Sequence, residues 1–320
     1  MWKPLEVAAH PARYFRKYGF RGLIDRTVNY PLRPIRRRLD QKAALAEARS
    51  YEAALARARS TDHPLPKILF YPDCPAPSSA IFKMCASMGF EMVSDPMSDV
   101  RLAVMWKDAT LVDAAPVEGI TTLNNDCRDI SKEAVARAFE AVFGYSFHVD
   151  PSTHCGPVVE KSDTNGLHDG AIVQSPVAPV PGRVYQRVID NQVGNGFVMD
   201  IRTPVIGDVI PFVYLKYRRI YDRFSNSNTR VARRPTSEMF SRDEVEKILA
   251  FSRNMGLDYG ELDILRDRGD GRIYIVDVNK TPAGPPNHLD REEGRRAMRE
   301  LGEAFASRFL TAPGSCACRP

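Results

Sequence analysis

The chain has 320 residues, of which 43% are hydrophobic and 27% are charged, and its formal net charge is +5. This length and composition are typical of a globular protein with enough residues for two compact units. The sequence contains no run of about 18 apolar residues and no apolar signal-peptide core, so we expect no transmembrane segment and a cytoplasmic location.

Residues 1–65 are predicted to form a basic helical arm, with helical patterns over 11–27 and 39–59. Ten basic residues lie between Arg13 and Lys42 against two acidic ones. Such a segment suits an anionic membrane surface or an acidic glycan, which would make the protein peripheral to the membrane, or it packs as a plain surface helix. No nucleic-acid motif accompanies it, which argues against a nucleic-acid partner.

Residues 66–128 alternate short strands and helices. KILFY, from Lys67, is a buried strand, and residues 78–88 are a helix with Ser78 or Ser79 as N-cap. Three further strands are expected in FEMVSD, VRLAVMW and ITTLNN, which together predict a small parallel sheet. The turn after the first strand lacks the glycines of a dinucleotide-binding fold.

Residues 130–144 are an amphipathic helix that ends at Gly144, with Val135, Phe139, Val142 and Phe143 on its inner face. The apolar strand PVVEKSD follows and carries Lys161, and the next loop contains Gly166 and Gly170. A lysine in an apolar strand needs an anionic partner, because burying its charge unpaired is costly.

A further strand, GRVYQRVIDN, precedes two or three strands between residues 199 and 219. The polar residues 225–234 are expected to form a lid, or else an ordinary surface loop. Residues 241–256 form a helix in which Ser241 and Glu244 have capping-box spacing. A last helix over residues 292–309 is expected to pack on the sheet.

Residues 256–286 are interpreted as a β-hairpin whose turn centres near Gly269. Glu261, Asp263, Asp277 and Asn279 all have odd numbers, and residues two apart on a strand point to one face. Carboxylate and amide oxygens suit Mg²⁺, which is usually completed by waters and substrate phosphates. The alternative is a solvated hairpin face with ordinary surface acids.

The pattern GxDxGxxDxL, followed by DGRIYIVDVNxTP, is similar to the C-terminal signature of the ATP-grasp superfamily. The resemblance implies that Asp263, Asp277 and Asn279 hold two Mg²⁺ ions on the phosphates of ATP. Two positions depart from the family's pattern, since Asp277 stands where many members have Glu and Glu261 where some have Arg.

The fold implied by the resemblance is α+β, an ATP-grasp domain over residues 129–310 preceded by a small α/β domain, the pre-ATP-grasp domain, over 66–128. The N-terminal helical arm, 1–65, and a C-terminal tail, 311–320, lie outside the resemblance. The tail carries Cys316 and Cys318, but the six scattered cysteines contain no CxxC pair and indicate neither a zinc site nor a disulfide framework.

The same resemblance implies an ATP site. It assigns adenine to the backbone of Arg187 and Ile189, although that segment is equally well a core strand. The whole set of expected ATP-binding residues is Lys132, Lys161, Gln186, Arg187, Ile189, Asp190 and Lys216, with Gln186 near the exocyclic amine, Asp190 near the ribose and the lysines on the phosphates. Asp200 is interpreted as a structural partner, and Lys132 is alternatively a solvated surface lysine.

The implied function is an ATP-dependent ligase that joins a small-molecule or carrier-bound carboxylate to an amine through an acyl phosphate. The expected catalytic residues are Arg202, Lys216, Arg218 and Glu261, with Glu261 recognising the amine and Arg219 and Arg230 as further candidates for the carboxylate. The alternatives are a phosphotransferase on the same ATP site and a non-catalytic ATP-binding protein. A homodimer is the common default.

Overall fold

The structure is a computed structural model that describes residues 65–311 except 97, 98, 101, 226 and 227, together with scattered residues between 38 and 60. The chain divides into two compact units, Met1–Glu52 and Ala53–Pro320. Most of the predicted arm, nearly all of its basic stretch and the C-terminal tail lie outside the described residues, so they stay predictions. Of the helical pattern over 39–59, the described residues between 42 and 57 are helical. The domain boundaries at 66 and 129 fall within the second unit and also stay predictions.

The first sheet is small and parallel, as predicted. Its strand order is β2-β1-β3-β4, and its strands are β1 (Lys67–Pro72), β2 (Glu91–Val93), β3 (Leu102–Trp106) and β4 (Thr121–Leu123). Helix α4 (Ala80–Met88) follows β1, and Ser79 caps it by accepting a hydrogen bond from the backbone N–H of Phe82.

A five-stranded antiparallel sheet forms the centre of the second unit. Its order is β10-β9-β8-β11-β12, and its strands are β8 (Phe197–Ile206), β9 (Val213–Arg219), β10 (Arg230–Arg234), β11 (Tyr259–Arg266) and β12 (Ile273–Asn279). Between β9 and α7 lie the short helices η2 (Ile220–Asp222) and α6 (Thr236–Met239).

Strand β10 corrects the prediction of a polar lid over residues 225–234. Residues 230–234 pair with β9, Val231 is buried, and Arg233 forms ion pairs with Glu293 and Glu300. The basic composition of this segment hid these partners, which come from the last helix of the chain.

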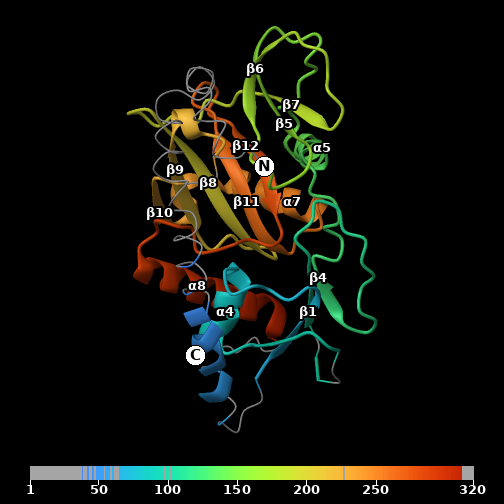
Figure 1. The fold of residues 1–320 in the computed structure, drawn as a ribbon, viewed down its shortest axis with the longest axis vertical. Helices are drawn as coiled ribbons and strands as arrows, with labels where there is room; N and C mark the ends of the chain where they lie inside the picture. The colour runs from blue at the N-terminus through green and yellow to red at the C-terminus, as the bar shows by residue number, and fades with distance from the viewer. Residues whose placement is uncertain are drawn as a thin grey trace. The chain divides into compact units, whose positions relative to one another are not determined.

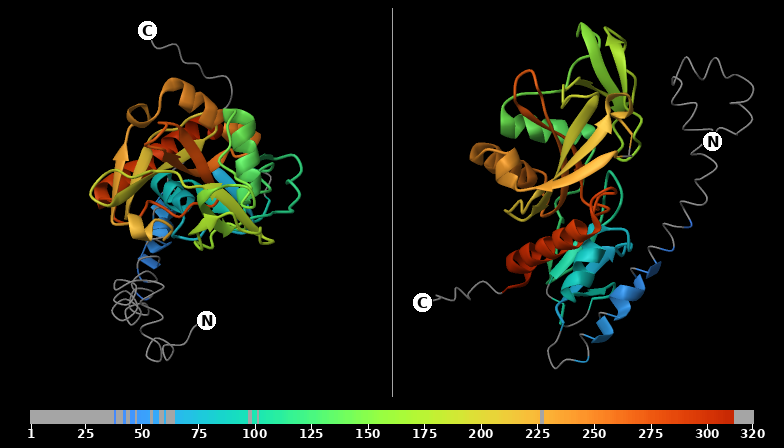
Figure 2. Two further views of the ribbon diagram at one scale, coloured as in Figure 1. Left: turned by 90° about the horizontal axis from the view of Figure 1, so that it is seen from above. Right: turned by 90° about the vertical axis from the view of Figure 1, so that its left-hand side faces the viewer.

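Helices cover both faces of the five-stranded sheet. Helix α5 (Lys132–Phe143) and helix α7 (Arg242–Asn254) share one apolar core with one face, and Figure 2 shows both on the same side. Helix α5 ends at Gly144, whose φ of 76° is one that glycine adopts without strain, and α7 begins with the predicted capping box. Helix α8 (Arg291–Phe305), continued by η3 (Ala306–Leu310), packs with α4 between the small sheet and the opposite face (Figure 1).

A three-stranded antiparallel sheet completes the second unit. Its order is β6-β5-β7, and its strands are β5 (Gly156–Ser162), β6 (Ala171–Ser175) and β7 (Arg183–Arg187). Residues 163–170 connect β5 to β6 and are called here the β5–β6 loop. The mixture of helices and sheets confirms the predicted α+β class.

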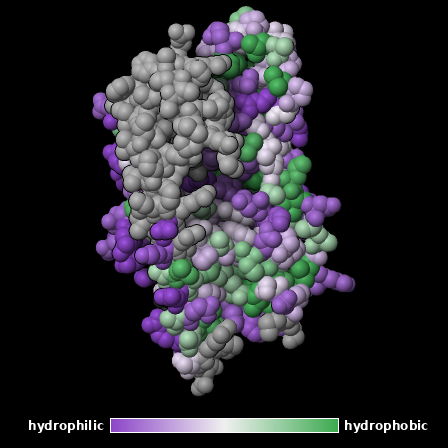
Figure 3. Space-filling view, viewed as in Figure 1, coloured by the Kyte–Doolittle hydropathy of each residue, from purple (hydrophilic) through white to green (hydrophobic). Residues whose placement is uncertain are grey.

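The coloured part of the surface in Figure 3 is mixed, with apolar residues scattered among hydrophilic ones. Among the described residues, no helix combines the length and the apolar character needed to cross a membrane.

Candidate active site

The β11–β12 hairpin has the register expected from the sequence. Asp263 lies opposite Asp277, and Glu261 lies opposite Asn279. The alternate residues Leu262 and Val278 are fully buried in the core shared with α5 and α7. Because successive residues of a strand point to opposite faces, the acidic residues are left together on the other face.

The two strands beside the hairpin extend this face with further charged residues. Asp200 and Arg202 lie two residues apart on β8, and Lys216 and Arg218 lie two residues apart on β9, so each pair shares one face of the sheet. Arg202 lies opposite Asp263, and Lys216 lies opposite Asp200. Four adjacent strands therefore place their charged residues on one side of the sheet, here called the charged face.

Asp263 is held by two cations of the charged face. Its Oδ1 lies 3.2 Å from Arg202 Nε and 3.5 Å from Lys216 Nζ. Burial raises the pKa of Asp263, but Arg202 and Lys216 outweigh it and hold this pKa well below its usual range. Asp263 is therefore a carboxylate at neutral pH.

Glu261 is only 2% exposed, and its Oε2 lies 3.3 Å from Arg202 Nε. Burial raises the pKa of Glu261 by more than Arg202 and Lys216 lower it. Among the described residues, Arg202 Nε, Glu261 Oε2 and Asp263 Oδ1 are buried atoms without a hydrogen-bond partner. Such atoms are uncommon in folded proteins, and here Arg202 Nε lies within ion-pair distance of both carboxylate oxygens.

Two lysines approach the hairpin from other elements. Lys132, in the first turn of α5, forms an ion pair with Asp277 and donates a hydrogen bond to Asn165 Oδ1 at 2.5 Å. Lys161, on β5, donates to the carbonyl oxygen of Val276 at 3.4 Å. Burial, reinforced by the charge of Lys132, lowers the pKa of Lys161 to about 8.

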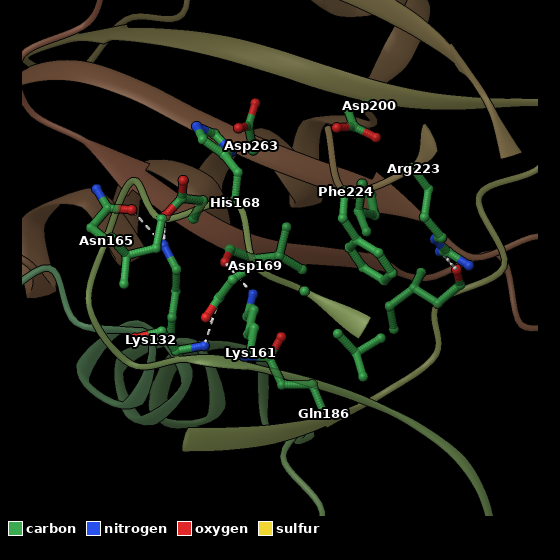
Figure 4. A pocket seen from close by; sticks show the side chains of 18 of the residues that line it. Lys132, Lys161, Asn165, His168, Asp169, Gln186, Asp200, Arg223, Phe224 and Asp263 are labelled. Atoms are coloured by element: carbon green, nitrogen blue, oxygen red, sulfur yellow. Dashed lines mark hydrogen bonds and ion pairs between the residues drawn. The ribbon is translucent and has the colours of Figure 1, made fainter. Parts of the chain in front are cut away.

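These elements line a partly open cavity of about 160 Å³. In Figure 4, Lys132 and Lys161 reach towards it from the side opposite Asp263 and Asp200. The predicted site residues that line the cavity are Lys132, Lys161, Gln186, Arg187, Ile189, Arg218, Asp263 and Asp277. The predicted residues outside its lining are Asp190, Arg202, Lys216, Glu261 and Asn279. Arg202, Lys216 and Glu261 adjoin it through Asp263 and through each other.

The segment expected to receive adenine is joined to the turn of the hairpin. Arg187 donates to Asp267 Oδ2 at 3.0 Å and to the hydroxyl of Tyr274 at 2.8 Å. Asp190 is paired with Arg268, whose Nη2 lies 2.8 Å from Asp190 Oδ2. The side chains of Arg187 and Asp190 thus contact the hairpin turn, and the role of Asp190 as a ribose partner stays a prediction.

Arg219 and Arg230 lie outside the cavity lining. Their guanidinium groups stack on aromatic rings, Arg219 at 4.0 Å from the centre of Phe197 and Arg230 at 3.9 Å from the centre of Tyr217. These cation–π contacts hold both guanidinium groups against aromatic rings of the sheet. Their assignment to a substrate carboxylate is therefore less favoured than that of Arg202 and Arg218.

Sequence reasoning missed several residues of the cavity. Asn165, His168 and Asp169 come from the β5–β6 loop, and Arg223 and Phe224 follow β9. A β-carbon at Gly170 would lie 2.7 Å from the ring of Phe224, so only glycine fits there without displacing the ring.

Arg223 donates to the carbonyl oxygen of Ile189 at 2.8 Å. Asp200, interpreted as a structural partner, pairs with Arg218 and accepts from Asn191 at 3.0 Å. Its spacing from Arg202, two residues along one strand, was the signal that would have placed it on the charged face.

The donor set of the charged face fits a hard divalent cation. Asp263 and Asp277 oppose each other, and Asp263 Oδ1 is buried without a hydrogen bond. Asn279 Oδ1 accepts from the backbone N–H of Thr281 at 3.0 Å. Within the described part of the chain, no group of three or more His, Cys, Asp or Glu side chains is placed to hold a metal ion. Two carboxylates and one amide leave most positions to water and phosphate, as is usual for Mg²⁺.

No protein-family description matches the chain, and neither does any curated protein sequence. Several solved structures that it resembles are ATP-grasp ligases. One is the ligase PsnB complexed with a phosphomimetic variant of its minimal precursor, Mg and ADP, at 12% identity and a TM-score of 0.49, covering 78% of this chain and 98% of that one.

Two others give similar figures. A RiPP-associated ATP-grasp ligase of Chryseobacterium gregarium has 15% identity and a TM-score of 0.42, over 76% of this chain and 97% of that one. A RimK domain ATP-grasp protein of Sphaerobacter thermophilus has 14% identity and a TM-score of 0.44, over 77% and 100%.

Proposed function

We propose that this protein is an ATP-dependent carboxylate–amine ligase that works through an acyl phosphate and releases ADP and phosphate. The observation that carries the proposal is the charged face. Two opposed carboxylates lie there among cations from several elements, namely Lys132, Lys161, Arg202, Lys216 and Arg218, beside a cavity. This combination suits a polyanion together with its metal ions.

The carboxylates are the candidate metal ligands. Asp263, Asp277 and Asn279 would hold two Mg²⁺ ions, which when bound neutralise phosphate oxygens during phosphoryl transfer. The protein's own part is to keep Asp263 ionised and both carboxylates in place. Arg202 and Lys216 stabilise the charge of Asp263, and the hairpin register places Asp263 opposite Asp277.

The lysines are the candidate phosphate ligands. Lys132 and Lys161 line the cavity and face the hairpin, and Lys216 adjoins it next to Asp263. Their ammonium groups would take up phosphate charge that the metal ions leave, in a setting with little water, where such contacts are strong.

The arginines of β8 and β9 are the candidates for the carboxylate substrate and its acyl phosphate. Arg218 lines the cavity, and its Nε is buried without a hydrogen-bond partner in the described structure. Arg202 Nε lies between Glu261 and Asp263, so Arg202 would act from beside the cavity through its other guanidinium nitrogens. A guanidinium group suits a carboxylate or an oxyanion. The substrate carboxylate itself attacks the γ-phosphorus, so no side-chain nucleophile is needed.

The position of Glu261 does not suit the expected role, recognition of the amine. Its 2% exposure argues against direct contact with an amine. We propose that it orients Arg202, whose Nε lies between Glu261 and Asp263.

Phosphate release tests this function. The protein is incubated with Mg-ATP and a panel of carboxylates and amines, with hydroxylamine present to trap an acyl phosphate as a hydroxamate. Hydroxamate and ADP support the ligase. A stable phosphoester would support the phosphotransferase, and ATP binding without turnover of any panel member would support a non-catalytic ATP-binding protein.

A further inference from the structure

The ammonium group of Lys132 is paired with Asp277, one of the carboxylates proposed to bind a metal ion. The Lys132 side chain is 9% exposed, and its Nζ also donates to Asn165 Oδ1 at 2.5 Å. Figure 4 shows Lys132 joined in this way to Asn165. A divalent cation bound to Asp277 would lie within a few ångströms of this ammonium group, and their repulsion would favour only one of them.

Asn165 connects Lys132 to the β5–β6 loop. Its Nδ2 donates to the carbonyl oxygen of Val278 at 3.3 Å, and its backbone N–H donates to Thr110 Oγ1 at 2.9 Å. The start of the loop is held separately, because the backbone N–H of Glu133 donates to Asp163 Oδ1 at 2.9 Å. The loop is thus fixed at its base to α5 and held over the cavity by Asn165.

The β5–β6 loop lines a cavity that is small for a nucleotide. The cavity measures about 160 Å³, whereas sites for cofactors and drug-sized ligands usually measure about 300–1,000 Å³. Asn165 is the loop residue whose side chain bonds both to Lys132 and to β12, so releasing Lys132 removes one of the contacts that keep the loop down.

We propose that Lys132 is the resident counter-ion of Asp277, that a divalent cation must displace it, and that Asn165 links this exchange to the opening of the β5–β6 loop. The inference rests on the proposed role of Asp277 as a metal ligand. Displaced from Asp277, the ammonium group of Lys132 becomes available to the phosphates of the incoming nucleotide. By reciprocity, a bound metal ion weakens the Lys132–Asp277 pair by the same factor as that pair weakens metal binding.

The test measures Mn²⁺ binding by the whole protein without nucleotide, through the loss of the free-ion signal in electron paramagnetic resonance. Lys132→Met is expected to bind Mn²⁺ about tenfold more tightly than the original protein, which is about 1.4 kcal/mol. Lys132→Arg keeps the charge and is expected to bind as weakly as the original protein. Asp277→Asn, alone or with Lys132→Met, is expected to lose the site.

Two further variants distinguish the effect of freeing Lys132 from the effect of loosening the β5–β6 loop. Asn165→Ala removes one anchor of Lys132 and is expected to tighten Mn²⁺ binding about threefold. Thr110→Val removes a tether of the loop without touching Lys132, and it is expected to tighten Mn²⁺ binding less than Asn165→Ala does. Hydrogen exchange of residues 163–170 is expected to accelerate in Asn165→Ala, and in the original protein when Mn²⁺ is added.

The inference fails if Lys132→Met binds Mn²⁺ no better than the original protein, if Asp277→Asn binds it equally well, or if no variant binds it. It fails as well if Thr110→Val tightens Mn²⁺ binding as much as Asn165→Ala does, because loop loosening would then explain the effect. Thermal unfolding checks that each variant is folded. Since neither ATP nor turnover enters these measurements, a protein that forms no hydroxamate but shows the Mn²⁺ pattern would refute the ligase proposal and leave this inference standing.

Discussion

The two faces of the β11–β12 hairpin differ completely in chemistry although they are built from alternate residues. On one face Leu262 and Val278 are fully buried against α5 and α7. On the other, Asp263 and Asp277 oppose each other beside a cavity. Because a strand alternates its side chains with a period of two, the residues that stabilise the fold and those that form the site are neighbours in sequence. Substitutions one residue apart should therefore have opposite consequences.

The largest effect is expected on the charged face. Asp277→Asn should reduce ATP-dependent phosphate release on the order of 10³-fold, since it removes a metal carboxylate from the reacting phosphates. Its side chain is 28% exposed but its partner Lys132 is only 9% exposed, so the free energy of unfolding should fall by about 1–2 kcal/mol. Steady-state kinetics and urea unfolding of the same preparation measure both. A large loss of stability with normal activity would erase the distinction between the faces.

The matched change on the apolar face is Leu262→Ala. Leu262 is fully buried, and removing its methyl groups leaves a cavity that should lower the free energy of unfolding by about 3 kcal/mol. At a temperature where the variant is fully folded, its affinity for ATP should stay within about twofold of the original value, because the opposite face is untouched. Urea unfolding and calorimetric titration provide the two measurements.

Asn124 tests how the hairpin is held in place. This fully buried residue accepts from the backbone N–H groups of Asp258 and Tyr259 at 2.9 Å and donates to the carbonyl oxygen of Tyr259 at 2.8 Å. Asn124→Ala leaves these groups unpaired and should cost about 2 kcal/mol of stability. Asn124→Asp keeps the acceptor but buries a carboxylate against the carbonyl oxygen of Tyr259, so it should lose more stability than Asn124→Ala. A smaller loss in Asn124→Asp than in Asn124→Ala would show that the acceptor oxygen outweighs the buried charge.

The hairpin could be predicted from the sequence because everything that forms it is local. Alternating residues and a glycine-containing turn set its register, so Asp263 and Asp277 were paired correctly. Lys161 could be singled out for a similar reason, because it lies in an apolar strand where its charge needs a partner. Lys132 was indicated by the ATP-grasp resemblance alone.

The contacts of the β5–β6 loop could not be predicted in this way. Asn165 bonds to Lys132, 33 residues away, and to Val278, 113 residues away, and no spacing rule connects such positions. The same holds for β10, whose Arg233 finds Glu293 60 residues further along the chain. Asp190 pairs with Arg268 across a comparable distance in sequence, which its strand pattern does not reveal.

The pH dependence of ATP binding tests whether Lys161, which faces the hairpin across the cavity, binds phosphate. Burial lowers the pKa of Lys161 to about 8, so in the free protein this lysine is charged at pH 7 and largely neutral at pH 9. If the charged form binds phosphate, the dissociation constant of ATP should rise about tenfold between pH 7 and pH 9. Lys161→Arg stays charged and should remove this rise. An equal rise in both proteins would assign it to another group.

The smallest effect is expected far from either face. Arg296 pairs with Glu292 on the exposed surface of α8, and such pairs contribute little. Arg296→Ala should change the free energy of unfolding by less than about 0.5 kcal/mol and leave phosphate release unchanged. A strong effect on either would mean that α8 contributes to the site.

The most direct test of the charged face as a nucleotide site is calorimetric titration of ATP with and without Mg²⁺, on the original protein and on Asp277→Asn. We predict binding that strengthens at least tenfold with Mg²⁺ in the original protein and gains nothing from it in the variant. ATP binding that ignores both Mg²⁺ and Asp277 would contradict the account.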